Sequence, residues 1–395
     1  MNIPLIDLKA QYNSISEELN KATLDVLSSA GYIMGKNVTE LESRFAEYTG
    51  SKYAISVGNG TDALVIALKA LGIKEGDEVI TTPFTFFATA ESISAVGAIP
   101  VFVDVRKDTF NIDTTKIEEK ITDKTKAIMP VHIFGQSADM DEINEIAKKH
   151  NLKVIEDACQ AVGGKYKGRK IGSLGDVACF SFFPTKNLGC AGDGGIIVTS
   201  DENVATIARA LRTHGSGENG QKAYNLLNNI EEDIAKAEGA DDTVYNPLKY
   251  YNYLIGHNSR LDAMQAAILL EKIKHIDNWN AKRREVAKIY DKELADTDLV
   301  TPFIDETNES VYHMYILQSE NREEILTKLK DKGVATGVYY PVPLHLQKVY
   351  KDLGYKEGDM PVSEYLSHRT FAIPVYPELT EEQIGYIIDS IKEEF

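Results

Sequence analysis

The sequence is poor in cysteine and has no long apolar run. Three cysteines in 395 residues (Cys159, Cys179 and Cys190) are too few for a disulfide framework, and no Cys-x-x-Cys pair indicates a zinc site. No apolar stretch approaches the length of a membrane-spanning helix, and the opening MNIPLIDLKAQY has neither the basic nor the apolar region of a signal peptide. We therefore expect a cytoplasmic protein that binds no metal and does not associate with a membrane.

Positive charge is also scarce. Lysine and arginine number 43 against 60 aspartates and glutamates, which gives a formal net charge of −17. This balance argues against nucleic acid as the main partner, although it leaves room for a local basic pocket that binds a small anion. With 43% hydrophobic and 26% charged residues, the composition is that of a globular protein long enough for two domains.

Seven runs rich in Val, Ile and Phe predict the strands of a buried sheet. They cover residues 52–58, 77–82, 99–105, 126–134, 152–158, 176–183 and 194–200. Helical patterns lie between several of them, for example over 61–72 and 140–151. This order predicts an α/β fold, a three-layer αβα domain with a mostly parallel seven-stranded sheet. Ligands of such sheets bind beyond the carboxyl ends of the strands.

The second half of the chain has a different pattern. A long helical pattern over 260–292 precedes a smaller α+β segment, and we place a large domain at 1–259 and a small C-terminal domain at 260–395. Between Glu218 and Asp242 seven acidic residues and two lysines give a local charge of −5. We interpret about 218–250 as an exposed acidic insertion, with a short helix over 228–239, that serves as a solvated surface rather than a binding site.

Two charged residues stand where strands are expected to end. Lys186 follows the apolar run of CFSFFPTKNLGCAGDGG (179–195), and Asp157 follows the run in VIEDACQ. A lysine at the mouth of a sheet loses hydration, which lowers its pKa and favours the nucleophilic amine of a Schiff-base lysine. A buried acid can pair with a protonated ring nitrogen such as that of pyridoxal phosphate (PLP). Without the neighbouring motifs, the simpler interpretation is that Lys186 is a surface lysine in a turn and that Asp157 is a helix cap or an ion-pair partner.

Two further stretches favour the same ligand. In SVGNGTDALVIAL a strand, a Gly-Asn-Gly turn and a helix start near Thr61 form a candidate phosphate cradle, or an ordinary capped turn. Three aromatic residues at 84, 86 and 87 either pack in the core or supply one ring that stacks on a planar ligand. A phosphate turn, an aromatic ring, an acid and, 29 positions after it, a lysine together predict one PLP site.

These motifs resemble those of the DegT-like sugar aminotransferases, PLP-dependent enzymes of the aspartate aminotransferase fold. The likeness runs from IPLIDLKAQY and GYIMGKNVTELE through NGTDAL, VIEDACQAVG and SFFPTKNLGCAGDGG to NSRLDAMQAAIL and YYPVPLHLQ. The insertion near 218–250 departs from most of the family.

The resemblance implies a role for each matching residue. Lys186 binds the cofactor covalently and moves the proton between substrate carbon and cofactor, while Asp157 pairs with the ring nitrogen. The remaining cofactor contacts are Gly60, Thr61, Asp62 and Ser181 at the phosphate, Gln160 at the phenolic oxygen, and Phe86 stacked on the ring. Asn258 reaches the phosphate of a neighbouring subunit, so the resemblance implies a homodimer with shared active sites. The substrate contacts that the resemblance implies are Arg260, Tyr339, Tyr340 and His345. Arg260 could instead pair with Asp262, and His345 has an equally plausible structural role.

The resemblance also implies the reaction. L-glutamate donates an amino group to the cofactor, which passes it to a nucleotide-linked keto-sugar in amino-sugar biosynthesis for a surface polysaccharide. Related sugar dehydratases have histidine in place of the lysine, so Lys186 favours transamination. A 3-keto sugar on UDP or dTDP is favoured over a 4-keto sugar, although Tyr339-Tyr340 replaces a His-Tyr pair of the UDP-ketouronate enzymes. The alternative functions are a non-catalytic PLP-binding regulator and a nucleotide-binding oxidoreductase.

Overall fold

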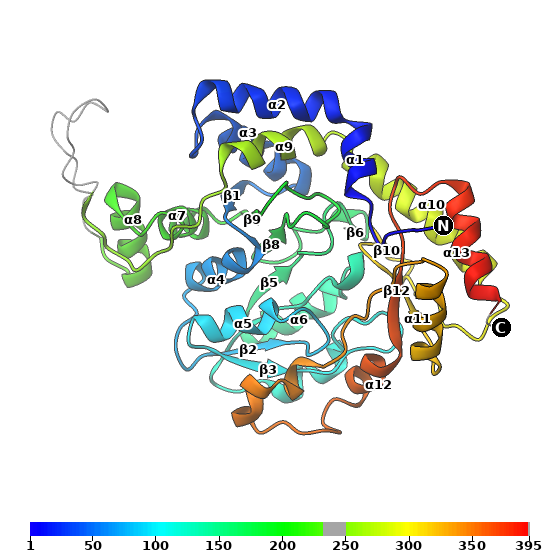
Figure 1. Cartoon of the computed structure of the whole chain (residues 1–395). Coiled ribbons are helices and arrows are strands. Elements are labelled where there is room, and N and C mark those ends of the chain that lie inside the picture. Colours follow the sequence, from blue (N-terminus) through cyan, green and yellow to red (C-terminus); the bar gives the residue numbers. More distant parts are fainter. Residues whose placement is uncertain (232–249, 394–395) are drawn as a thin grey trace.

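The computed structural model describes residues 1–231 and 250–393, and a seven-stranded sheet lies at its centre (Figure 1). In spatial order the strands are β1 (Tyr53–Val57), β9 (Gly195–Thr199), β8 (Val177–Ser181), β5 (Lys153–Asp157), β4 (Thr125–Ile128), β2 (Glu78–Thr81) and β3 (Ile99–Phe102). Neighbours from β8 to β3 are parallel, whereas β9 runs antiparallel to both β8 and β1. The predicted fold class is confirmed.

Every predicted strand is present but shorter than its apolar run. The clearest case is the run 126–134, of which β4 takes only the residues up to Ile128. Pro130 follows and has no amide hydrogen for a sheet bond, and Phe134 has a positive φ of 53°. The apolar residues after Ile128 therefore form a buried loop at the carboxyl edge of the sheet.

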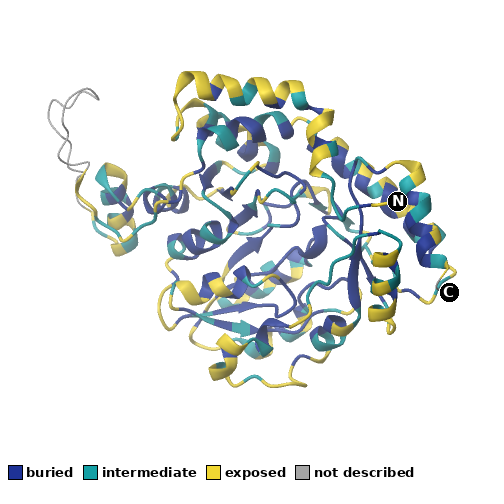
Figure 2. Ribbon diagram, in the orientation of Figure 1, coloured by how far each residue is buried: buried dark blue, intermediate teal, exposed yellow. Residues whose placement is uncertain are grey.

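Helices cover both faces of the sheet. Strand side chains alternate between two buried clusters: Val154 and Ala178 pack with α3, α6 and α9, whereas Ile155 and Val177 pack with α4 and α7. The helices named here are α3 (Lys36–Thr49), α4 (Gly60–Ala70), α6 (Met140–His150), α7 (Glu202–Leu211) and α9 (Ala263–Lys272). Figure 2 shows the strands buried between helices whose outer faces are exposed.

The pattern over 260–292 is two helices rather than one. Helix α9 ends at Lys272, and α10 (Ile276–Glu293) begins after a turn in which the amides of Lys274 and His275 bond to carbonyls three residues back. The turn separates α9, which packs on the large sheet, from the later part of α10, which packs in a C-terminal core.

The C-terminal core combines helices with an antiparallel strand pair. The pair is β11 (Tyr315–Gln318) and β12 (Thr370–Ile373), and it packs with α10, α11 (Arg322–Asp331) and α13 (Glu381–Lys392). Ile3 from the N-terminus joins this core and bridges to Val334, so both termini lie on this side of the molecule (Figure 1). The domain boundary at 260 stays a prediction.

The other α-helices and strands complete the fold. They are α1 (Leu8–Ser14), α2 (Ser16–Ser29), α5 (Ala88–Ala95), α8 (Gly217–Asn228), α12 (Pro361–Arg369), and the small sheet of β10 (Asn308–Glu309), β6 (Lys165–Tyr166) and β7 (Arg169–Lys170). Helix α8 occupies the start of the predicted insertion and packs beside α7, with Ala223 fully buried (Figure 1). Most of the helix expected over 228–239 lies outside the described residues.

Candidate active site

The carboxyl end of β5 places a buried acid at the edge of the sheet. Asp157 is 5% exposed, and its carboxylate accepts hydrogen bonds from Thr89 Oγ1 (2.8 Å) and the Cys159 amide (3.3 Å). Thr89 lies in α5, which follows β2, and β4 lies between β2 and β5 in the sheet. No basic side chain within the described ranges forms an ion pair with Asp157. The carboxylate is therefore held by neutral donors and remains available to a cationic partner.

Lys186 lies in the loop after β8, the strand next to β5. The loop folds back on itself, since the Lys186 amide bonds to the Phe183 carbonyl (2.8 Å). Burial lowers the pKa of the Lys186 amine below the usual 10.5, against the opposing effect of the Asp157 carboxylate. The half-buried lysine thus combines a raised fraction of neutral, nucleophilic amine with a carboxylate nearby.

The start of α4 forms a cradle against the end of β8. A Cβ built on Gly60 would lie 2.7 Å from Ser181 Cβ and 3.3 Å from Cys159 Sγ, so only glycine allows this approach. Asn59 caps the helix by accepting from the Asp62 amide (2.8 Å). Within the described chain the amides of Gly60 and Thr61 have no acceptor. Two free amides beside a serine hydroxyl at a helix N-terminus suit a phosphate group.

Gln160 and Tyr340 form a polar pair at the same edge. The Gln160 side-chain oxygen accepts from the Phe134 amide (2.9 Å), and its nitrogen donates to the Tyr340 hydroxyl (2.9 Å). Tyr340 stacks on Phe134, and burial raises its pKa. Phe86, by contrast, is 60% exposed, which leaves its ring free to stack on a ligand.

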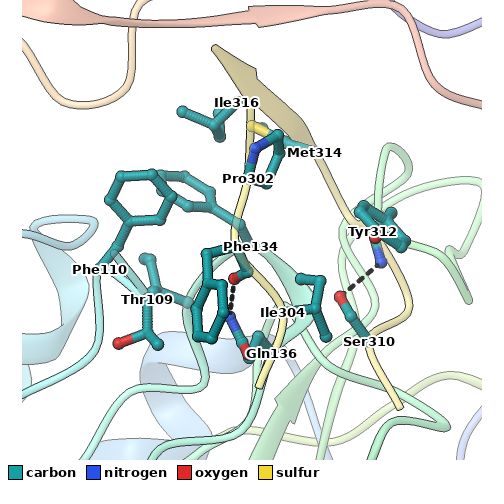
Figure 3. Close-up of a pocket in the computed structure, with 12 residues that line it drawn as sticks. Thr109, Phe110, Phe134, Gln136, Pro302, Ile304, Ser310, Tyr312, Met314 and Ile316 are labelled. Carbon is teal, nitrogen blue, oxygen red and sulfur yellow. Dashed lines mark hydrogen bonds between the residues drawn. The ribbon is translucent and has the colours of Figure 1, made fainter. Parts of the chain in front are cut away.

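A small apolar pocket lies behind Phe134 (Figure 3). Phe110, Ile304 and Met314 are among the side chains that line it, and they leave only about 10 Å³ of free volume. That space holds about one water molecule. The pocket is therefore too small for a sugar or a cofactor, and the side chains around it pack next to Phe134.

The predicted phosphate contact Asn258 and the predicted substrate contact Arg260 lie in an exposed segment. Asn258 and Arg260 are exposed, and Arg260 forms no ion pair with any described residue, since Asp262 caps α9 through the amides of Met264 and Gln265. Between them, Ser259 accepts from the Gly58 amide (2.9 Å) and donates to Asp62 (2.6 Å). The segment is thus anchored to the phosphate turn of its own chain.

The predicted substrate contacts Tyr339 and His345 lie, like Tyr340, in the C-terminal part of the chain. Tyr339 is half-buried, and its carbonyl accepts from Thr370 Oγ1 (2.9 Å). His345 is 1% exposed, and its Nε2 lies 3.0 Å from Glu364, whose carboxylate also accepts from the amides of Gly358 and Met360. The structure therefore gives His345 a place in a buried network rather than at the open edge.

The sequence profile of the DegT/DnrJ/EryC1/StrS aminotransferase family matches residues 13–392. The chain belongs to this family. It is 46% identical, over all of this chain and 98% of the relative, to a protein of Geobacillus stearothermophilus described as a pleiotropic regulatory protein. It is 42% identical, over 98% of both chains, to the UDP-2-acetamido-2-deoxy-3-oxo-D-glucuronate aminotransferase of Pseudomonas aeruginosa. The crystal structure of NtdA from Bacillus subtilis with bound cofactor PMP matches with a TM-score of 0.84 and 32% identity, over 99% of this chain and 85% of that one. The predicted family and enzyme class are confirmed.

The site residues of this family member fit a pyridoxal cofactor. Asp157 is a buried carboxylate without an ion pair in the described parts of the chain, Lys186 offers an amine, and Gly60 and Thr61 offer free amides. These groups match the ring nitrogen, the aldehyde and the phosphate of PLP, respectively. The described residues contain no cluster of metal ligands and no helix long and apolar enough to cross a membrane.

Two residues of the site were not predicted from the sequence. Thr89 bonds to Asp157, and its only sequence signal is a position one turn after the aromatic group at 84–87. His313 lies 127 positions after Lys186, and its Nε2 is 3.5 Å from the Lys186 Nζ. A single histidine in the segment before β11 carries no spacing signal, so only the fold could bring it here.

Proposed function

We propose that the chain is a PLP-dependent aminotransferase that moves the amino group of L-glutamate to a nucleotide-linked 3-keto sugar. The observation that carries the proposal is the convergence of Lys186, Asp157 and the Gly60–Ser181 cradle at one edge of the sheet. The bound PMP of the Bacillus subtilis structure supports the cofactor, because PMP is the amine form of PLP.

Each residue then has a physical task. When bound, PLP withdraws electrons from the substrate carbon next to its nitrogen. Asp157 keeps the ring nitrogen protonated, and Thr89 holds that carboxylate in place. Lys186 would hold the cofactor through its amine and would move the proton at the substrate carbon.

The other contacts position the cofactor. The amides of Gly60 and Thr61 and the Ser181 hydroxyl bind the phosphate, whereas the Asp62 amide already bonds to Asn59. Phe86 stacks on one face of the ring. Gln160 keeps one amide hydrogen after its bond to Tyr340, and this hydrogen is available for the phenolic oxygen.

The sugar is proposed as a 3-keto sugar on UDP or dTDP, used to make an amino sugar for a surface polysaccharide. The name of the Pseudomonas aeruginosa relative specifies a 3-oxo sugar, which supports C3 over C4. Tyr340, whose hydroxyl accepts from Gln160, and the half-buried Tyr339 are the proposed substrate contacts. Because His345 is committed to Glu364, we assign it to the structural framework and leave it out of the substrate contacts.

We also propose a homodimer whose active sites are shared. Arg260 is exposed and has no described anionic partner in its own chain, so its guanidinium is available to a pyrophosphate or carboxylate across an interface. Mixing inactive Lys186→Ala and Arg260→Ala proteins under subunit exchange should restore about a quarter of wild-type activity, since half the random dimers regain one of two sites. No recovery despite proven exchange would place both residues in the same chain's site.

A PLP-binding regulator remains the second candidate because of the name of the Geobacillus stearothermophilus relative. The deciding experiment records the visible spectrum of the PLP-loaded protein before and after addition of L-glutamate, and then assays products with UDP- and dTDP-linked 3- and 4-keto sugars. A glutamate-dependent spectral change followed by formation of an amino sugar supports the enzyme. A stable PLP spectrum that glutamate does not alter favours the regulator.

A further inference from the structure

His313 contacts Lys186 and not the apolar pocket next to it. Ser310, Tyr312, Met314 and Ile316 all line the apolar pocket behind Phe134, where Figure 3 shows them as sticks. His313 is not among the residues that line this pocket, and its Nε2 lies 3.5 Å from the Lys186 Nζ instead.

The backbone around His313 is held tightly. A Cβ built on Gly135, whose φ is +103°, would lie 2.9 Å from the amides of both Tyr312 and His313, so glycine is required for this contact. The Gly135 carbonyl accepts from the Val311 amide (3.1 Å). Arg283, which is buried in α10, donates to the Tyr312 carbonyl (3.1 Å). The imidazole is therefore presented from a fixed segment.

The hydrogen bonds determine which nitrogen of His313 carries the proton. The Asn280 side-chain nitrogen donates to the Val162 carbonyl (3.0 Å), which leaves its oxygen as an acceptor. The Asn187 nitrogen donates to this oxygen (2.8 Å) and to the Val311 carbonyl (2.9 Å). The Asn187 oxygen, 3.2 Å from His313 Nδ1, is then an acceptor, so Nδ1 carries the hydrogen. His313 Nε2 is consequently the unprotonated nitrogen.

We propose that His313 is a positioning residue for Lys186, which presents the unprotonated Nε2 as a fixed hydrogen-bond acceptor for the lysine amine. The contact holds the amine at the carboxyl edge of the sheet whenever it is not bonded to a cofactor. The imidazole stays neutral in this arrangement, because burial and the neighbouring charges of Lys186 and Arg283 keep its pKa well below 6.5. The inference rests on the proposed role of Lys186 as the cofactor lysine.

The experiment separates positioning of the amine from binding of the cofactor. Cofactor-free wild-type protein and the His313→Phe and His313→Gln variants are mixed with PLP, and the rate of covalent attachment is followed by absorbance. The affinity for PMP, which makes no covalent bond to Lys186, is measured in parallel. Phe fills the volume of the ring without an acceptor, whereas Gln offers a side-chain oxygen near the place of Nε2. His150→Gln serves as the control, because His150 contacts Glu118 on the surface.

We expect His313→Phe to slow attachment about tenfold or more, since small displacements of a reacting group cost that much in rate. Its PMP affinity should stay within about twofold of wild type, and His313→Gln should recover most of the attachment rate. If His313→Phe does not fold, His313→Leu replaces it. The proposal would be overturned if His313→Phe attached PLP at the wild-type rate, or if it lost as much affinity for PMP as it lost attachment rate. It would also be overturned if His313→Gln attached PLP as slowly as His313→Phe. If wild-type protein itself binds PMP but attaches no PLP, the proposed function fails instead.

Discussion

Replacing Gly60 by alanine tests the phosphate cradle with the smallest change available. The added methyl would lie 2.7 Å from Ser181 Cβ, 3.2 Å from Ser181 Oγ and 3.3 Å from Cys159 Sγ. Real Cβ atoms do not approach other atoms within 3.0 Å. Either α4 or the end of β8 must therefore move, and these are the two elements that carry the free amides and the serine hydroxyl.

The size of the effect follows from two opposing contributions. Overpacking of a tight site costs about 1–3 kcal/mol, while alanine in place of a helical glycine gains at most about 1 kcal/mol. We expect Gly60→Ala to lower the free energy of unfolding of the cofactor-free protein by about 1–2 kcal/mol. A hydrogen bond to a charged group contributes about 1.5–3 kcal/mol, so losing one phosphate contact should weaken PMP binding by about 10- to 100-fold.

Urea unfolding and PMP titration measure these two effects, and Gly385→Ala is the matched control. Gly385 lies within α13, and nothing lies within 4 Å of a Cβ built on it. That variant should gain about 0.5–1 kcal/mol of stability and bind PMP like the wild type. A Gly60→Ala protein with wild-type PMP affinity would refute the assignment of the cradle to the phosphate.

Three further predictions concern the residues around the ring. Asp157→Asn should keep the fold but lower kcat by orders of magnitude, because the ring nitrogen loses its acid partner; a steady-state assay with wild-type kcat would make Asp157 a structural acid. Thr89→Val should lower kcat about 10- to 100-fold through the lost bond to the carboxylate, and an unchanged kcat would show that Asp157 needs no such support. Because burial lowers the pKa of Lys186, its amine should become reactive to trinitrobenzenesulfonate at lower pH in the cofactor-free protein than in the urea-unfolded chain. Peptide mapping across a pH series measures this, and equal midpoints would contradict it.

The sequence predicted the sheet well because its strands are buried on both faces. Runs such as 152–158 contain apolar residues for both clusters, so they read as continuous β-prone stretches and correspond closely to the observed strands. The same runs drew attention to Lys186 and Asp157, which follow apolar residues, as candidate cofactor contacts, and their roles stay predictions. Strand ends were less accurate where, as after Ile128, the apolar run continues into a buried loop.

The features that could not be predicted from the sequence depend on contacts between distant segments. Gln160 and Tyr340 are 180 positions apart, and their hydrogen bond exists only because the C-terminal part packs on the carboxyl edge of the sheet. The break between α9 and α10 was missed because helical periodicity continues through 273–275, although the two helices pack in different cores. From the sequence, substrate contact and a structural role were equally plausible for His345, and its burial beside Glu364 could not be inferred from composition.

The central claim is that Lys186 is the lysine that bonds to PLP. The most direct measurement loads the protein with PLP, reduces it with borohydride and locates the pyridoxyl group by peptide mapping. We expect a single modified peptide that carries the label on Lys186, and no label in Lys186→Ala treated in the same way. A label on Lys165 or Lys170, the lysines of the small sheet formed by β6 and β7, would contradict it.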